Sequence, residues 1–225
     1  MHPKATSNLN ILKITASARR QRSLSRKLAS KFIAEWIDRR PDDVVVEQDV
    51  AANPPPIVTE EWIAAAFTAG EDRSETQKNV LSSSDELISE LEDADIIVIA
   101  TPMYNYGMPA TLKAWFDQVI RINKTFSFDL KRGDFPLQPI LGGKTLVVLT
   151  STGEFGFLNG GIRSNMNHLL PHISTCAFYL GVDEDDIHHV GIEYQEFQDD
   201  RHEQSIDDAG KAISALVVEL CQDIG

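Results

Sequence analysis

The chain has 225 residues, of which 42% are hydrophobic, and a formal net charge of −13 at pH 7. This length is sufficient for one sizeable α/β domain. The acidic balance argues against nucleic acid as a partner, because contact with a phosphate backbone needs a basic surface. The longest apolar runs have the length of strands, short of the roughly 20 residues that a membrane helix needs, so we expect no membrane insertion.

The cysteine content and the first residues bear on the compartment. Cys176 and Cys221 are the only two cysteines, and they form neither a CxxC pair nor a zinc-binding set. The start of the chain lacks the charged-then-apolar pattern of an export signal. Both features favour the reducing cytoplasm. We predict one domain over 1–225, with 1–8 as a loose N-terminal tail.

Strand-like and helix-like segments alternate along the chain. Short apolar runs are typical of strands that are buried on both faces of a parallel sheet. Segments with apolar residues at helical spacing lie between them. In chain order we predict a strand over 10–15, a helix over 23–39, a strand over 44–48, an extended proline-rich segment over 51–57, a short helix capped by Thr59, a helix over 75–92, a strand over 95–100, a helix over 110–122, a strand over 145–150, a helix over 165–180, a strand over 187–192 and a last helix from about 206. The helix over 165–180 is expected either to bend at Pro171 or to start near it.

This alternation indicates a parallel sheet with right-handed crossovers and helices on both faces. Pro102 has no backbone N–H, so we expect the third strand to stop before it. Ligands of such sheets bind at the carboxyl ends of the strands. Three loops that follow the first, third and fourth strands are therefore candidates for a binding site.

The first loop leads from a strand into a helix and is rich in hydroxyl groups. Ser17, Ser23 and Ser25 can donate hydrogen bonds to an anion, and a helix start adds unpaired backbone N–H groups. The glycines of a GxGxxG dinucleotide motif are absent. The pattern favours a phosphate site, although Ser23 could instead serve only as a helix cap.

The second loop, 103–107, suits a flat heteroaromatic ligand. Tyr104 and Tyr106 can wall in a ring, and the Asn105 amide can pair with its edge. Gly107 would let the backbone come close. Two tyrosines around an asparagine make a poor core sequence, which favours the binding role.

The third loop, 151–157, carries Gly153 and Gly156, which permit close approach to a ring. Phe155 and Phe157 in the same loop could wall the pocket or only pack against the protein. From the residues alone, these two alternatives are equally favoured.

Several non-periodic motifs make the chain resemble the FMN-dependent NADH-azoreductase family, whose flavodoxin-like members also act as NAD(P)H:quinone oxidoreductases. The resemblance extends from about residue 9 to the carboxyl end. Its most specific features are the runs P-M-Y-N-Y from Pro102, L-K-A-W-F-D from Leu112 and T-F-S-F from Thr125.

The resemblance implies a flavodoxin-like three-layer α/β/α fold whose five-stranded parallel sheet has the order 2-1-3-4-5, with FMN at the switch point. The residues it implies for FMN are Ser17, Ser23, Leu24 and Ser25 at the phosphate, and Pro102, Met103, Tyr104, Asn105, Tyr106, Ser151, Thr152, Gly153 and Glu154 at the ring. The implied walls of the substrate pocket are Phe126, Phe128, Phe155 and Phe157.

One departure from the family concerns charge. The family more often has S-R-G-G where this chain has Ser151-Thr152-Gly153-Glu154. A Glu154 carboxylate that pointed inward would raise the cost of forming an anionic reduced flavin.

By this resemblance, we expect an enzyme in which NADH or NADPH reduces bound FMN, and a quinone or an aromatic azo compound then takes two electrons in a ping-pong mechanism. The flavin carries the chemistry, so no protein acid or base and no metal is expected to be essential. His168 and His172 lie at i, i+4 on a predicted helix, but they lack a third metal ligand. The resemblance also implies a homodimer, in which 54–67 covers the partner's pocket.

Three alternatives remain open from the sequence. The first is a flavodoxin-type electron carrier that shuttles single electrons. The second is an FMN reductase that releases its reduced flavin. The third is a regulatory or interaction domain without flavin, because a fold does not fix a function.

Overall fold

A five-stranded parallel sheet forms the centre of the computed structural model, which describes residues 8–223. The tail predicted over 1–8 falls outside the described residues except for Asn8. The strands lie in the order β2-β1-β3-β6-β7, which is 2-1-3-4-5 within this sheet, so the predicted flavodoxin-like order is confirmed. Their bounds are β1 (Asn10–Thr15), β2 (Val44–Asp49), β3 (Ile96–Pro102), β6 (Thr145–Ser151) and β7 (Ile187–Ile192).

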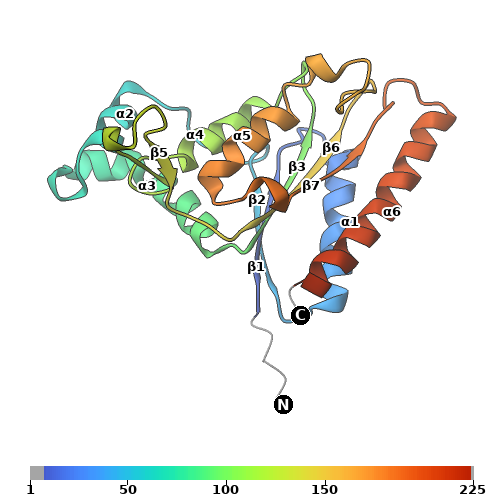
Figure 1. Ribbon diagram of the computed structural model, residues 1–225, viewed down its shortest axis with the longest axis horizontal. Coiled ribbons are helices and arrows are strands. Elements are labelled where there is room, and N and C mark those ends of the chain that lie inside the picture. The colour runs from blue at the N-terminus through green and yellow to red at the C-terminus, as the bar shows by residue number, and fades with distance from the viewer. Residues whose placement is uncertain (1–7, 224–225) are drawn as a thin grey trace, which may run out of the picture.

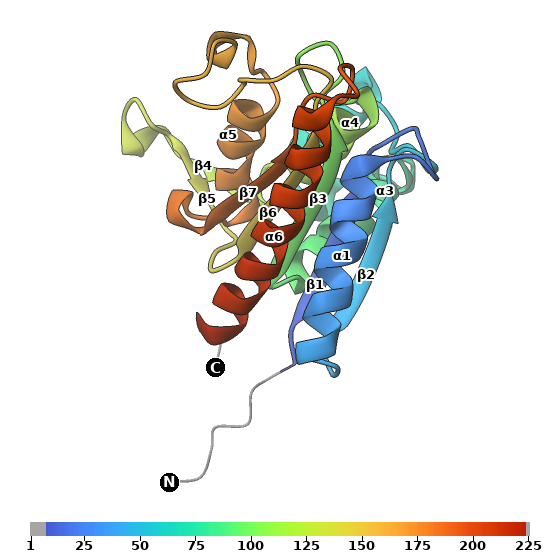
Figure 2. The ribbon, with the colours of Figure 1, turned by 90° about the vertical axis from the view of Figure 1, so that its right-hand side faces the viewer.

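Helices cover both faces of the sheet, with α1 and α6 on one face and α3, α4 and α5 on the other (Figures 1 and 2). The helices are α1 (Leu24–Arg39), α2 (Glu60–Phe67), α3 (Glu75–Asp93), α4 (Ala110–Val119), α5 (Leu170–Leu180) and α6 (Asp200–Asp223). Short 3-10 helices are η1 (Gly70–Asp72), η2 (Leu130–Arg132), η3 (Ser164–Met166) and η4 (Glu184–Asp186). Among residues 8–223, no helix combines the length and the apolar character needed to cross a bilayer.

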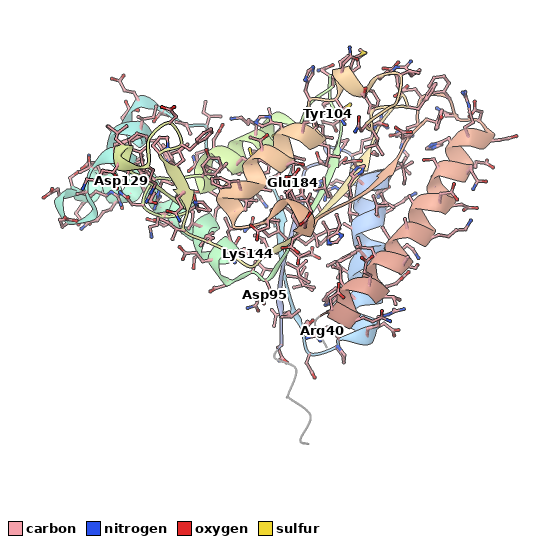
Figure 3. All side chains as sticks on the ribbon, in the orientation of Figure 1. Arg40, Asp95, Tyr104, Asp129, Lys144 and Glu184 are labelled. Carbon is pink, nitrogen blue, oxygen red and sulfur yellow. The ribbon has the colours of Figure 1, made fainter. Side chains whose placement is uncertain are left out.

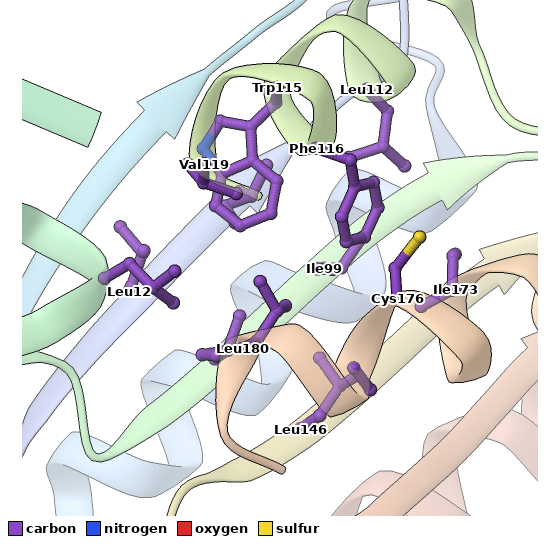
Figure 4. Close-up of a cluster of buried hydrophobic side chains, with 14 of the residues drawn as sticks. Leu12, Ile99, Leu112, Trp115, Phe116, Val119, Leu146, Ile173, Cys176 and Leu180 are labelled. Carbon is purple, nitrogen blue, oxygen red and sulfur yellow. The ribbon is translucent and has the colours of Figure 1, made fainter. Parts of the chain in front are cut away.

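Strand alternation divides the core into two clusters. Leu12 and Ile99 point toward α3, α4 and α5, where Trp115 and Phe116 are fully buried against them (Figure 4). Ile11 points to the other face, toward α1 and α6. Each fully buried side chain of this size contributes about 1.5–3 kcal/mol, so the two clusters fix the sheet between its helix layers.

The third strand is longer than predicted, because β3 runs through Pro102, which lies in register with Ser151. The backbone N–H of Met103 bonds to the carbonyl of Ser151 at 2.9 Å, so the nitrogen of Pro102 faces the opposite edge. There the pairing with β1 has already ended at Ala100. The missing N–H of proline therefore costs no ladder hydrogen bond, and the expected stop does not occur.

Two helix boundaries also differ from the prediction. α4 ends at Val119 instead of 122, whereas α5 starts at Leu170, one residue before Pro171, which agrees with the predicted alternative of a start near that proline. α6 starts at Asp200, six residues earlier than expected, because its first turns are polar and show no apolar periodicity. The hairpin of β4 (Phe126–Phe128) and β5 (Leu137–Pro139) was not predicted at all, since its strands have three residues each.

A buried polar network anchors the segment that contains α2. The Trp62 indole N–H donates to Gln118 Oε1 at 2.9 Å, and Gln118 Nε2 donates to the carbonyl of Pro56 at 2.8 Å. These hydrogen bonds hold α2 in a position in which the side chains of Ile63 and Phe67 are exposed. The segment and the hairpin both lie at the end of the molecule remote from α1 and α6 (Figure 1).

Candidate active site

A cavity of about 200 Å³ lies where the three predicted loops meet at the carboxyl ends of the strands. Tyr104 marks this end of the sheet, while Asp95 and Arg40 mark the opposite end (Figure 3). The residues that line the cavity are Ser17, Arg19, Arg22, Ser23, Leu24, Pro102, Met103, Tyr104, Ser151, Gly153, Gln195 and Glu196.

The first loop, 16–23, contributes hydroxyl groups and a helix start. Ser23 caps α1, because its Oγ accepts a hydrogen bond from the backbone N–H of Arg26 at 3.3 Å. Its Oγ also lies 3.3 Å from Ser25 Oγ. Ser17, Ser23 and Ser25 are all buried, although Ser25 does not line the cavity. Arg19 and Arg22 add positive charge at this end.

Arg26 fixes the shape of the first loop. Its guanidinium donates to both carboxylate oxygens of Asp49, at 2.7 and 2.8 Å, and to the carbonyl of Ser17, at 2.8 and 3.2 Å. A further bond reaches Thr15 Oγ1 at 2.9 Å. The hydrogen bond from Arg26 is also the main reason that the pKa of Asp49 is lowered. Sequence reasoning missed this pair, because no motif connects residues 23 positions apart.

The second loop, 103–107, is a tight two-residue turn. The backbones of Tyr104 and Gly107 bond to each other at 2.9 and 3.0 Å, and Asn105 and Tyr106 adopt positive φ angles of 47° and 66°. These two residues therefore adopt the left-handed backbone conformation that this type of turn requires. A Cβ at Gly107 would have its nearest protein neighbours at 4.0 Å, so its close approach to a ligand stays a prediction.

Both tyrosines of the second loop are partly exposed, at 39% and 40%, so neither is a core aromatic. The Tyr104 hydroxyl accepts from the backbone N–H of Ala18 at 3.3 Å. The Tyr106 hydroxyl donates to Glu154 Oε2 at 3.3 Å. The second loop is thereby joined to the first loop on one side and to the third on the other. Tyr104 lines the cavity, whereas Asn105 and Tyr106 do not.

The third loop, 151–157, presents alternate residues to the cavity. Ser151 and Gly153 line it, while the Thr152 side chain points away and donates to the carbonyl of Glu154 at 2.8 Å. A Cβ at Gly153 would lie 2.7 Å from Glu196 Cγ, so a larger residue here would displace the Glu196 side chain.

Glu154 does not point its charge into the cavity. Its Oε1 pairs with Arg163 Nη2 at 3.0 Å, and Arg163 is held by a second bond to the carbonyl of Phe155 at 3.1 Å. The expected repulsion between the Glu154 carboxylate and an anionic reduced flavin is thus offset by the guanidinium of Arg163. The carboxylate that lines the cavity is instead that of Glu196.

A fourth loop, 193–199, was missed by sequence reasoning. It follows β7 and brings Gln195 and Glu196 to the cavity. Its backbone is tied to the third loop, since the N–H of Gln195 donates to the carbonyl of Thr152 at 3.2 Å. The only available signal was that this loop also follows a strand, because its residues match no motif.

The four phenylalanines expected in a substrate pocket are not gathered in this cavity. Phe126 packs edge-on against Tyr179 at 5.3 Å, and Phe128 is exposed on the hairpin. Phe155 stacks on Tyr194 at 4.5 Å, outside the cavity. Phe157 is buried and belongs to a neighbouring cavity. Within one chain, therefore, these rings form no common wall.

The histidine pair considered as a metal site does not share a helix. His168 precedes α5, which begins at Leu170, so the expected i, i+4 arrangement with His172 is wrong. Among residues 8–223, no group of three or more His, Cys, Asp or Glu side chains is arranged to hold a metal ion.

The geometry agrees with a comparison to known proteins. A family model described as a flavodoxin-like fold matches residues 9–217. A relative from Colwellia psychrerythraea, described as FMN-dependent NADH:quinone oxidoreductase 2, is 52% identical, with 94% of this chain and 99% of the relative covered. One from Pseudomonas aeruginosa, FMN-dependent NAD(P)H:quinone oxidoreductase 1, is 41% identical, with 92% and 97% covered. The chain belongs to the family of flavodoxin-like, FMN-dependent NAD(P)H:quinone oxidoreductases.

Solved structures support the fold. An azoreductase from Bacillus anthracis superposes with a TM-score of 0.82 at 23% identity, with 93% of this chain and 98% of that chain covered. An FMN-dependent NADH-azoreductase from the same species, solved in complex with FMN, also has a TM-score of 0.82, at 17% identity, with 95% and 99% covered. At these identities the likeness shows the fold alone.

Proposed function

We propose that this protein passes two electrons from NADH or NADPH to quinones, and to aromatic azo compounds, through FMN that is held where the three loops meet, partly in the cavity of about 200 Å³ and partly outside it. The observation that carries the proposal is the convergence of the first three loops on one cavity, with hydroxyl groups at one end and the tyrosine turn at the other. The relatives described as FMN-dependent quinone oxidoreductases support it.

The first loop fits the phosphate of FMN. Ser17 and Ser23 are buried cavity residues, and Ser23 caps α1, whose first backbone N–H groups and helix dipole favour an anion. Arg19 and Arg22 add the positive charge that a phosphate dianion needs. Leu24 and Ser25 complete this end, with Ser25 acting through its contact with Ser23.

The second and third loops fit the isoalloxazine ring. Pro102, Met103 and Tyr104 form one wall of the cavity, and Ser151 and Gly153 form another. The two positive-φ residues, Asn105 and Tyr106, hold the turn in shape, and Thr152 and Glu154 brace the third loop through its backbone and through Arg163. The absence of a Cβ at Gly153 leaves room for the Glu196 side chain beside that wall.

When bound, FMN supplies the two-electron chemistry between NAD(P)H and the acceptor. The protein's own part would be to bind and orient FMN: the loops would hold the ring at the carboxyl ends of the strands and would leave one side of it accessible. We propose that the reductant and the acceptor occupy that accessible side in turn, which gives ping-pong kinetics.

We further propose a homodimer in which the partner completes the pocket. Exposed apolar side chains occur on the anchored α2 segment, at Ile57 and Phe67, and on the hairpin, at Phe128 and Phe135. Such a concentration of exposed apolar surface is typical of a protein interface. In a dimer, Phe126 and Phe128 would contribute to the partner's pocket instead of their own. The free thiols Cys176 and Cys221 support a cytoplasmic location.

The test is the visible absorption of protein that has been loaded with FMN and desalted, before and after anaerobic NADH and then a quinone. We expect retained yellow colour that NADH bleaches and quinone restores. A matched pair, Ser23→Ala in the cavity and Ser82→Ala on the exposed face of α3, tests the site. Only the first variant should lose FMN, and its affinity for riboflavin, which lacks the phosphate, should be unchanged.

Other outcomes would favour the alternatives. Retained colour that NADH does not bleach, with a stable one-electron state in titrations, would identify an electron carrier. Bleaching with loss of the flavin on desalting would identify an FMN reductase. No flavin retention by the wild type would overturn the proposal.

A further inference from the structure

A second, larger cavity of about 740 Å³ lies behind the wall of the candidate active site. The two cavities share Met103 and are separated by the carboxyl end of β6. Side chains alternate in an extended segment. Ser151 and Gly153 accordingly line the first cavity, and Thr150 and Thr152 line the second.

The second cavity has an apolar floor. It lies along β7, the edge strand of the sheet, and between the loop that precedes α5 and the first half of α6. Its volume is in the range of about 300–1,000 Å³ that is typical of small-molecule sites. The apolar residues of the floor are Phe157, Leu169, Leu170 and Ala209, while Leu158 and Ala212, which also line the cavity, are exposed.

One corner of this cavity is built around an imidazole. His189 Nε2 lies 2.8 Å from Thr150 Oγ1. A Cβ at Gly191 would lie 2.7 Å from the same oxygen and 3.2 Å from the His189 ring, so the arrangement needs glycine at 191. Burial lowers the pKa of His189 to about 4, so the ring is neutral at pH 7 and can hydrogen-bond without adding positive charge.

The polar part of the lining is acidic. Glu193, Asp200 and Asp208 contribute three carboxylates against the single guanidinium of Arg201. Asp208 has Lys211 at 3.6 Å, on the exposed side of α6. An anion would therefore be repelled from this cavity, and a cation would be attracted.

The positive charge of Arg201 is already balanced. Its Nη2 pairs with Asp199 Oδ2 at 2.6 Å, and the guanidinium lies 4.9 Å from the ring centre of Tyr194 and 4.8 Å from that of Phe197. This packing holds Arg201 at the rim, where it cannot neutralise Asp200 and the other carboxylates as well.

We propose that the second cavity binds a flat, drug-sized aromatic monocation, with its rings on the apolar floor and its charge at the acidic rim. A small inorganic cation would not use the floor, and an aromatic anion would meet the carboxylates. The proposal does not depend on the function proposed for the first cavity.

The test uses FMN-loaded protein and the fluorescence anisotropy of rhodamine 6G, an aromatic monocation, with fluorescein as a flat anion of similar size. We expect saturable binding of rhodamine 6G that weakens as salt is added, and no binding of fluorescein. FMN fills part of the first cavity in this experiment, and the variants described next distinguish binding in the second cavity from binding on the accessible side of the flavin.

Three variants locate the binding. Ala212→Phe places a ring over the exposed part of the cavity and should weaken rhodamine 6G binding by about tenfold or more, a loss of about 1.4 kcal/mol. Asp200→Asn removes one rim charge and should weaken it by about threefold, as expected for a partly exposed ion pair. The matched control is Asp207→Asn, which removes the same charge from α6 outside the lining and should have no effect.

FMN retention, measured in parallel, shows whether each variant is folded. Two outcomes would overturn the proposal. One is equal binding of rhodamine 6G and fluorescein. The other is rhodamine 6G binding that Ala212→Phe and Asp200→Asn leave unchanged in protein that retains FMN.

Discussion

The Tyr104 hydroxyl and the backbone N–H of Ala18 form a hydrogen bond of 3.3 Å across the mouth of the candidate active site. This bond connects the second loop to the first, although 86 residues separate them in sequence. It holds together the two ends of the cavity proposed for FMN, so its loss should change ligand affinity more than fold stability.

Tyr104→Phe removes this bond and keeps the ring. A single partly exposed hydrogen bond contributes about 0.5–1 kcal/mol, so we expect FMN to bind about two- to fivefold more weakly. Quenching of FMN fluorescence during titration of the apoprotein measures the affinity. Tyr179→Phe, on α5, is the control; equal affinities for the two variants would show that the bond has no role.

Arg26→Met should destabilise the protein by about 2–3 kcal/mol, because it strips Asp49 of its charge partner and leaves the carbonyl of Ser17 without its donor. Urea unfolding measures the loss. Lys27→Met replaces an exposed cation one residue later and should be nearly neutral. The role assigned to Arg26 is wrong if the two variants unfold at the same urea concentration.

Arg163→Gln should lower the reduction potential of bound FMN, since it leaves the Glu154 carboxylate uncompensated beside the second loop. One added negative charge at that range should raise the free energy of the anionic reduced flavin by about 1 kcal/mol, which lowers the two-electron reduction potential by about 20 mV. Equilibrium dye titration measures the potential. The double variant Arg163→Gln, Glu154→Gln should return it to the wild-type value; a double variant as low as the single one would contradict this account.

His189 should make the protein less stable as the pH falls from about 6.5 to about 4. Its pKa is about 4 in the folded protein, against 6.5 for an unperturbed histidine, so over this interval the unfolded chain binds the proton and the folded protein does not. Above this interval the imidazole is neutral in both states, and below it both are protonated.

When the pH is lowered from 7 to 5, the free energy of unfolding should therefore fall by about 1–2 kcal/mol less in His189→Gln than in the wild type. Urea unfolding at the two pH values measures the difference. An unchanged pH dependence in His189→Gln would show that this ring is not the group responsible.

Much of the fold was predictable, because its signals are local. The apolar run that ends at Ala100 predicts strand β3, and the apolar face of Trp115 and Phe116 predicts helix α4. The hairpin at Phe126–Phe128 was not, since three-residue strands show no alternation.

The site divides in the same way. Ser23 could be found as a cap from its own neighbourhood. Arg26 with Asp49, Glu154 with Arg163, and the fourth-loop residues Gln195 and Glu196 are brought together only by the fold. No pattern of spacing along the chain connects them.

The short segment from Thr150 to Gly153 separates two chambers with opposite electrostatic character. The side chains of this segment alternate, so that Ser151 and Gly153 line the first cavity and Thr150 and Thr152 line the second. Inserting or deleting one residue here would exchange the two sets of side chains, and would place threonines where the chain now has Ser151 and Gly153. Length at this point is thus as strongly constrained as composition, and variation in relatives of this fold should take the form of substitution instead of insertion.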